Sequence, residues 1–124
     1  MLARYQMKRG TPASELPQGI RQDTRKHTRH LLRPPAELVT EYLASPSDAA
    51  AKRFRTGYRK AVLARRAADA AGFDQLAQLA RQADVFLGCS CPTHKNPNVR
   101  HCHTWFALEL MSELYDGLDV RFPE

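Results

Sequence analysis

The residues best suited to chemistry are gathered in one short segment, from Cys89 to Thr104. These 16 residues contain all three cysteines of the chain, three of its five histidines and two cations, Lys95 and Arg100. Thiols and imidazoles bind metals, attack electrophiles and transfer protons. The segment follows an apolar run, residues 84–88, and precedes an amphipathic helix. Because ligands of open α/β sheets bind where the chain leaves the carboxyl end of a strand, we predict the functional site here.

The first chemistry that this segment could support is a metal centre. If Cys89 and Cys91 continue the strand, their side chains share one face, and Cys102 supplies a third thiolate. The fourth ligand would be His94, His101 or His103. Only one residue separates Cys89 from Cys91, whereas structural zinc sites usually place about two to four between paired cysteines. Zinc held by Cys89, Cys91, Cys102 and His103 is therefore one hypothesis for the cofactor.

The second chemistry is an activated thiol or an anion site at a helix start. Cys102 stands at the N-terminus of the last predicted helix, where free N–H groups and the helix dipole stabilise a thiolate or a phosphate. Cys102 is then a candidate nucleophile and His103 its acid or base. The candidate ligand-binding residues of this segment are Lys95, Arg100, His101 and Thr104. Three cationic residues at the end of the first predicted strand would line the same binding site if the strands over 2–7 and 84–88 are neighbours: Arg4, Lys8 and Arg9.

The third interpretation is structural. Cysteine is among the most buried residue types, so Cys89 and Cys91 can pack a core, and histidines can cap a helix or bind buried carbonyls. This interpretation leaves the gathering of all these residues in one place unexplained. All three interpretations remain open from the sequence alone.

The net charge of +6 is confined to the beginning of the chain. Residues 1–35 carry eight Lys or Arg and two acidic residues, while the rest carries eleven of each sign. A basic face of this kind either keeps a protein in solution or attracts an anionic partner, such as a phosphate-bearing ligand or nucleic acid. Tyr5 is the one aromatic residue in this stretch, so stacking on exposed bases is poorly supported.

The periodicity predicts a small α/β fold. We expect strands over 2–7, 84–88 and 118–122, an irregular segment over 13–35, and helices over about 36–45, 48–70, 73–82 and 104–115. Ser47 is suited to cap the second helix. This order favours a single small layered domain over 1–124, with a short, mostly parallel sheet flanked by helices. The expected core comprises Phe54, Tyr58, Leu76, Val85, Phe86, Leu87, Trp105, Leu108 and Met111.

The chain also resembles a known family. The stretches that carry the resemblance are residues 4–10, 32–38, 53–58, 85–89 and the Cys102-His103-Thr104 triplet. Together they are similar to the YeaO-like proteins of domain-of-unknown-function family 488, which are small bacterial α/β domains with a Cys-His pair opening a helix. This chain departs from the usual pattern in having Thr104 after the pair and in its enlarged loop at 94–99. The resemblance implies a fold and a site, but no reaction.

We therefore predict a bacterial cytoplasmic protein that binds a nucleotide-like or other phosphate-bearing ligand at Cys89 to Thr104. The cytoplasm is expected because the cysteines are predicted to be reduced thiols. In addition, no apolar run is long enough to cross a membrane, and the N-terminus lacks the apolar stretch of a secretory signal. The alternative is a non-catalytic module that binds nucleic acid or protein, in which the cysteines and histidines only support the fold, with or without zinc.

Overall fold

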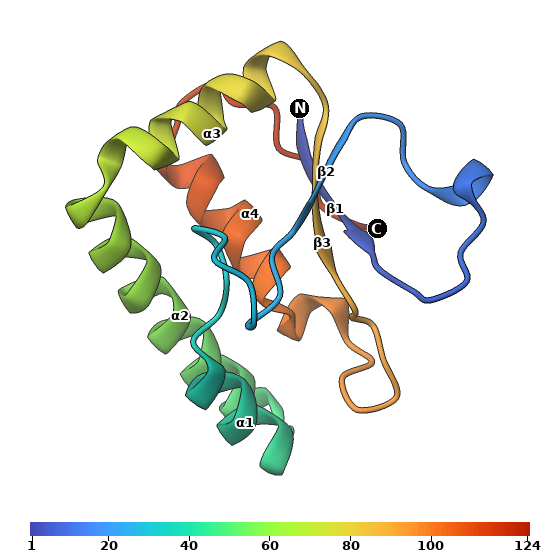
Figure 1. The fold of residues 1–124 in the computed structure, drawn as a ribbon. Helices are drawn as coiled ribbons and strands as arrows, with labels where there is room; N and C mark the ends of the chain where they lie inside the picture. Colours follow the sequence, from blue (N-terminus) through green and yellow to red (C-terminus); the bar gives the residue numbers. More distant parts are fainter.

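The structure is a computed structural model and describes the whole chain, residues 1–124. Three strands and four α-helices follow one another in the order β1, β2, α1, α2, α3, β3, α4 (Figure 1). Their bounds are β1 Leu2–Gln6, β2 Ile20–Asp23, α1 Ala36–Ala44, α2 Asp48–Ala68, α3 Ala70–Gln82, β3 Val85–Cys89 and α4 His103–Leu114. Two short 3-10 helices lie in the connections, Ala13–Glu15 and Val99–His101. The predicted α/β class is confirmed.

The strands form one parallel sheet in the order β1-β3-β2. The central strand β3 pairs on both sides, which explains its continuous apolar sequence. Its register places Gln6 of β1 opposite Cys89, and Asp23 of β2 opposite Gly88. All three strands therefore stop at the same edge of the sheet, and the loops that follow them lie together.

A glycine is required near this edge, at Gly88. A Cβ atom there would lie 2.7 Å from Sδ of Met7 and 2.9 Å from Cε1 of Tyr5, both of which are closer than real Cβ contacts. The side chains of Tyr5 and Met7 thus lie against Gly88, and a larger residue there would have to displace them.

The two outer strands differ from the sequence prediction. β2 lies inside the segment that we expected to be irregular, because its edge position leaves Ile20 to Asp23 exposed or half-buried and without an apolar alternation. The predicted closing strand over 118–122 is reduced to one bridge between Leu2 and Val120. Arg121 donates its N–H to the Leu2 carbonyl, but the next donor of a parallel ladder would come from Pro123, which has no N–H.

The helices lie on one side of the strands, and α4 lies between α2 and the sheet (Figure 1). Most of the expected core is buried, but Phe86 and Trp105 are only partly buried. Phe86 alternates with Val85 and Leu87 and so points to the face away from the helices. Trp105 lies near the surface, where it packs on Phe122 with ring centroids 4.9 Å apart. None of the helices has both the length and the apolar composition needed to cross a membrane.

Side-chain caps set the helix starts. The predicted Ser47 cap is present, since its Oγ accepts the Ala50 N–H at 3.0 Å. The third helix begins at Ala70, before the predicted start, because Asp69 caps it by accepting the Gly72 N–H at 3.1 Å.

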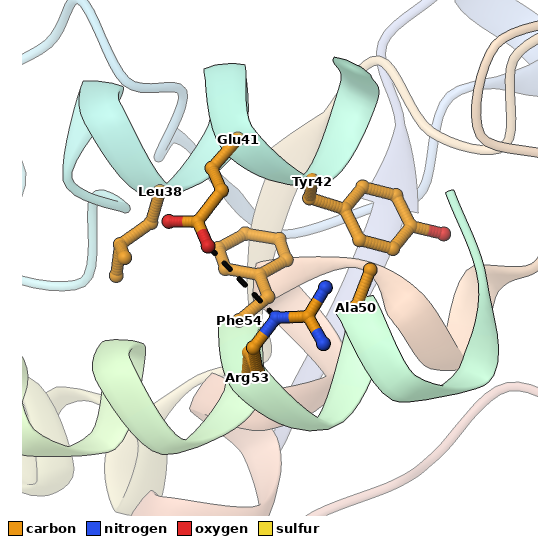
Figure 2. Close-up of a pocket in the computed structure, with 6 residues that line it drawn as sticks. All are labelled: Leu38, Glu41, Tyr42, Ala50, Arg53 and Phe54. Atoms are coloured by element: carbon orange, nitrogen blue, oxygen red, sulfur yellow. Dashed lines mark ion pairs between the residues drawn. The ribbon is translucent and has the colours of Figure 1, made fainter. Parts of the chain in front are cut away.

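Helices α1 and α2 pack closely through aromatic side chains. The rings of Tyr42 and Phe54 lie 5.7 Å apart between their centroids. Figure 2 shows the small hollow beside them, with an ion pair of 3.9 Å between Glu41 and Arg53 at its rim. The hollow encloses about 10 Å³, which is too small for a ligand. Its role is packing, and it places the Tyr42 ring.

Candidate functional site

The three cysteines come together where the strands end. Cys89 is the last residue of β3, Cys91 follows in the loop, and Cys102 immediately precedes α4. Their sulfur atoms all lie within 4.8 Å of one another, and none is in a disulfide. Cys89 and Cys102 are buried, whereas Cys91 is partly exposed. The structure thus brings together the three thiols that the sequence placed in one segment.

His103 completes this cluster from the first turn of α4. Its Nδ1 lies 3.8 Å from Sγ of Cys89 and 3.9 Å from Sγ of Cys102, and its ring is buried. The other ring nitrogen, Nε2, lies 2.8 Å from Oγ1 of Thr24, just after β2. Cys89, Cys91, Cys102 and His103 are called the Cys–His cluster below.

The hydrogen bonds around Thr24 assign the protons of His103. The Thr24 hydroxyl donates to the Gly88 carbonyl at 3.0 Å, so its oxygen is free to accept a proton from Nε2 of His103. In this tautomer Nδ1 carries a lone pair and faces the sulfur atoms. The sequence contained no signal for Thr24, because it lies 79 residues away from His103 in the chain.

A second set of bonds holds the Cys102 sulfur from the opposite side. Thr104 donates its hydroxyl proton to Sγ of Cys102 at 3.1 Å, and Arg4 donates from Nε to the Thr104 oxygen at 2.9 Å. The Arg4 guanidinium also donates to the Cys91 carbonyl. Arg4 and Thr104, predicted as ligand contacts, therefore lie behind the cluster and connect β1, the loop and α4.

The thiols share their protons unequally. Hydrogen bonds from Cys89 and Cys91 hold the pKa of Cys102 well below its usual range, against the opposing effect of burial. The bond to Cys102 raises the pKa of Cys91 to about 11, and it raises the pKa of Cys89 as well. Cys102 is thus the sulfur on which a negative charge is best stabilised.

A pocket of about 280 Å³ opens above the Cys–His cluster. Its floor contains all four cluster residues, and an apolar wall comes mainly from α1 and α2. The wall residues are Pro34, Val39, Tyr42, Leu43 and Phe54, and the polar and basic residues are Arg25, Lys26, His27, Ser90, Thr93, Lys95 and Asn96. This volume approaches that of small-molecule sites, which begin at about 300 Å³.

A polar network on one side of the pocket was not predicted. The Tyr42 hydroxyl donates to Oδ1 of Asn96 at 3.2 Å and lies 2.8 Å from Nδ1 of His101. The amide of Asn96 in turn approaches Sγ of Cys91 at 3.5 Å. This network fixes the loop after β3 against α1. The sequence predicted Tyr42 only as part of the apolar face of a helix, since nothing in its local sequence relates it to His101.

The remaining predicted ligand residues lie in different places. Lys95 lines the pocket, and His101 supports it through Tyr42. Arg100 lies instead over the Trp105 ring, 5.3 Å from its centroid. Lys8 and Arg9 are exposed in the turn beyond β1 and do not line the pocket. Of the five lysine and arginine residues predicted as ligand contacts, only Lys95 lines the pocket.

The donor set of the cluster suits a metal ion. The three sulfur atoms are close enough together to hold one. In a tetrahedral zinc site with bonds of about 2.0–2.3 Å, ligand atoms are about 3.3–3.8 Å apart, and the distances from His103 Nδ1 to two sulfurs, 3.8 and 3.9 Å, are only slightly longer. The Thr24 hydroxyl would serve as the outer partner that metal-bound histidines usually have.

Fold and site together define a small parallel α/β domain with a cysteine-histidine cluster at the carboxyl edge of its sheet. The family model DUF488-N3a, described as the active DUF488-N3 subclade, matches residues 5–114. The chain therefore belongs to the DUF488 family of YeaO-like proteins, which confirms the resemblance seen in the sequence. No curated protein and no solved structure matches the chain.

Proposed function

We propose that the pocket above the Cys–His cluster binds a phosphate-bearing ligand of nucleotide-like size. The observation that carries this proposal is the composition of the pocket: basic residues on its rim face an apolar, partly aromatic wall. A phosphate group suits the former and a flat organic group suits the latter. A bacterial cytoplasmic location fits the proposal, because the three thiols would stay reduced there.

The free positive charge of the rim comes mainly from two lysines. Arg25 is already held by Asp23, with which it makes a two-point contact at 2.8 and 3.0 Å. Lys26 and Lys95, which enter the pocket from different loops, are exposed and make no ion pair. Charge-assisted hydrogen bonds to a phosphate would therefore come from Lys26 and Lys95.

The start of α4 adds donors at the floor of the pocket. The N–H groups of Trp105 and Phe106 donate to the Cys102 carbonyl. By contrast, those of His103 and Thr104, at the start of α4, have no main-chain partner. They favour an anion, as does the positive end of the helix dipole. The description of the subclade as active supports turnover of such a ligand, with Cys102 as nucleophile and His103 as acid or base.

The test is calorimetric titration of the full chain with pyrophosphate and with ADP. The double variant Lys26→Ala/Lys95→Ala should bind at least about tenfold more weakly, because each charged contact is worth about 1.5–3 kcal/mol. The matched control is Lys52→Ala/Lys60→Ala, which removes the same charge from exposed positions of α2 outside the pocket. Equal affinities of wild type and both variants would refute the proposal.

A second candidate is a structural zinc centre, favoured by the free Nδ1 lone pair of His103 beside the sulfur atoms. Cys89, Cys91, Cys102 and His103 would hold the ion, which would tie the loop after β3 to the start of α4. Four protein ligands leave no open position for catalysis. The chain would then be a non-catalytic module, whose basic segment 1–35 binds nucleic acid or an acidic protein.

Metal content and thiol reactivity separate these candidates. Protein purified without chelators or a metal-affinity tag should contain about one equivalent of zinc if the second candidate holds. Its thiols should then react only after a chelator is added. Metal-free protein with one fast-reacting thiol would instead support the first candidate.

A further inference from the structure

We propose that the metal-free cluster reduces hydroperoxides, with Cys102 as the attacking sulfur and Cys91 as the thiol that resolves the intermediate. This activity goes beyond ligand binding in the pocket and does not depend on it. Three independent features of the structure support this activity: the environment of the Cys102 sulfur, the proximity of a second thiol, and access for a small oxidant.

The first feature is the pair of donors behind Cys102. The Thr104 hydroxyl points its proton at Sγ of Cys102, at 3.1 Å, and Arg4 holds the Thr104 oxygen at 2.9 Å. A hydroxyl has one proton, so the donation from Arg4 fixes its direction toward the sulfur. This arrangement stabilises a negative charge on the sulfur before it attacks.

The second feature is the choice of partner thiol. All three sulfurs lie within 4.8 Å of one another, but a disulfide also requires suitable Cβ directions and Cα separation. Cys89 belongs to the central strand, which is paired on both sides and cannot shift easily. Cys91 lies in the loop that follows and is partly exposed. The Cys91 main chain is held by Arg4, but rotation of its side chain breaks only the 3.5 Å contact with the Asn96 amide and can bring its sulfur toward Cys102.

The third feature is access. Cys102 has only 1% of its surface exposed, yet it lines the floor of the pocket. A molecule as small as hydrogen peroxide can reach it through this opening, whereas bulky alkylating reagents meet Cys91 first. The site thus selects for a small electrophile at Cys102.

The proposed reaction uses hydrogen peroxide as the oxidant and a small thiol as the reductant. The Cys102 thiolate attacks one peroxide oxygen, the O–O bond breaks, and hydroxide leaves and takes up a proton to become water. Cys102 is now a sulfenic acid. The Cys91 thiol displaces its hydroxyl as a second water, which forms the Cys91–Cys102 disulfide. Two equivalents of a small thiol then reduce the disulfide and are themselves oxidised to a disulfide.

The experiment uses the full chain, reduced and freed of metal with a chelator, and treated with one equivalent of hydrogen peroxide. We expect two of the three thiols to be lost, with fragmentation spectra that link Cys91 to Cys102 and with full recovery by dithiothreitol. In Cys91→Ser the sulfenic acid should persist on Cys102 and be trapped by dimedone. Oxidation at the rate of free glutathione, or a linkage without Cys102, would overturn the proposal.

The role of Thr104 is tested by a matched pair of variants. Thr104→Val, which has nearly the same shape but no hydroxyl, should slow peroxide consumption by about tenfold or more, while Thr104→Ser should keep most of the rate. Thr40→Val, at an exposed hydroxyl of α1, serves as the control. If Thr104→Val does not fold, Thr104→Ala and Arg4→Gln provide the same comparison. Equal rates in the folded variants would also overturn the proposal.

These outcomes are separate from those of the ligand proposal. The variant Lys26→Ala/Lys95→Ala should lose phosphate binding and keep the peroxide rate, because neither lysine contacts the Cys102 sulfur. Thr104→Val should show the reverse pattern.

Discussion

The two ends of the sheet are held together in different ways. At the amino ends the contacts are mostly main chain: the Met1 amino group donates to the Ala83 carbonyl at 3.1 Å, and the Leu2 N–H donates to the Asp119 carbonyl at 2.8 Å. At the carboxyl ends the contacts are made by thiol, imidazole, hydroxyl and guanidinium groups. Main-chain bonds do not depend on residue type, whereas side-chain groups can exchange one partner for a ligand or a metal. The amino end therefore serves stability, and the carboxyl end serves chemistry.

The largest effect on stability should come from the amino end. Leu2→Ala, at a fully buried position of β1, should lower the free energy of unfolding by about 2–5 kcal/mol, through lost burial and the cavity left behind. Urea unfolding measures this, with Leu63→Ala as the control, since 40% of Leu63 is exposed. Phosphate binding in the absence of urea should be unchanged. A smaller loss than in the control would contradict the assignment of Leu2 to the core.

Acid should lower the free energy of unfolding through His30, which lies in the segment between β2 and α1. Burial lowers the pKa of His30 to about 4, and its ring nitrogens are occupied: Nδ1 accepts from Leu32 and Nε2 donates to Gln22. Below about pH 6.5 the His30 side chain is protonated in the unfolded chain but stays neutral in the folded chain. Stability therefore falls as the pH drops from about 6.5 to about 4. The loss is at most about 3 kcal/mol.

Unfolding in urea at several pH values tests this dependence. In His30→Gln the slope between about pH 6.5 and 4 should become shallower, while His27→Gln, at an exposed position, should leave the slope unchanged. Equal slopes in wild type and His30→Gln would show that His30 does not stay neutral in the folded chain.

Thr24→Val tests the assignment of the His103 protons. The variant leaves Nε2–H of a buried histidine without an acceptor, which should cost about 1–3 kcal/mol in unfolding experiments. If the cluster holds zinc, its affinity should also fall by about 10–100-fold, as measured by chelator competition. Thr28→Val is the control, because Thr28 bonds only within its own turn. Unchanged stability together with unchanged zinc affinity would contradict the contact between Thr24 and His103.

The smallest effect should come from the ion pair at the rim of the hollow in Figure 2. Glu41 and Arg53 are 3.9 Å apart, and more than 60% of each side chain is exposed. Arg53→Ala should therefore change stability by less than about 1 kcal/mol, measured by urea unfolding. A larger loss would show that this face contributes to stability beyond simple packing of α1 on α2.

The sequence predicted the elements whose pattern is local. Helices α1, α2 and α4 follow from apolar spacing and caps, and β3 follows from its uninterrupted apolar run. The edge strand β2 could not be found, because its side chains are exposed and its only signal is pairing with a strand more than sixty residues further along the chain. The last strand was overestimated, since only the position of Pro123 relative to the ladder shows where pairing stops.

The candidate site divides in the same way. Cys89, Cys91, Cys102 and His103 were predicted because they are close in sequence and of unusual type. Thr24 and Tyr42 were missed because their roles depend on contacts between distant segments. The sequence also could not show that the Arg100 guanidinium lies over the Trp105 ring and outside the pocket lining. Spacing along the chain thus located the floor of the pocket, but only the fold supplied its walls.

The most direct test of the central claim is a titration of the ¹⁵N-labelled full chain with pyrophosphate, followed by backbone amide chemical shifts. We predict saturable shifts at the carboxyl end of the sheet, in Lys26, Lys95, His103 and Thr104, and none at Leu2 or Val120 at the amino end. Shifts that are absent, or that appear only in the exposed turn at Lys8 and Arg9, would contradict the assignment of this pocket as a phosphate site.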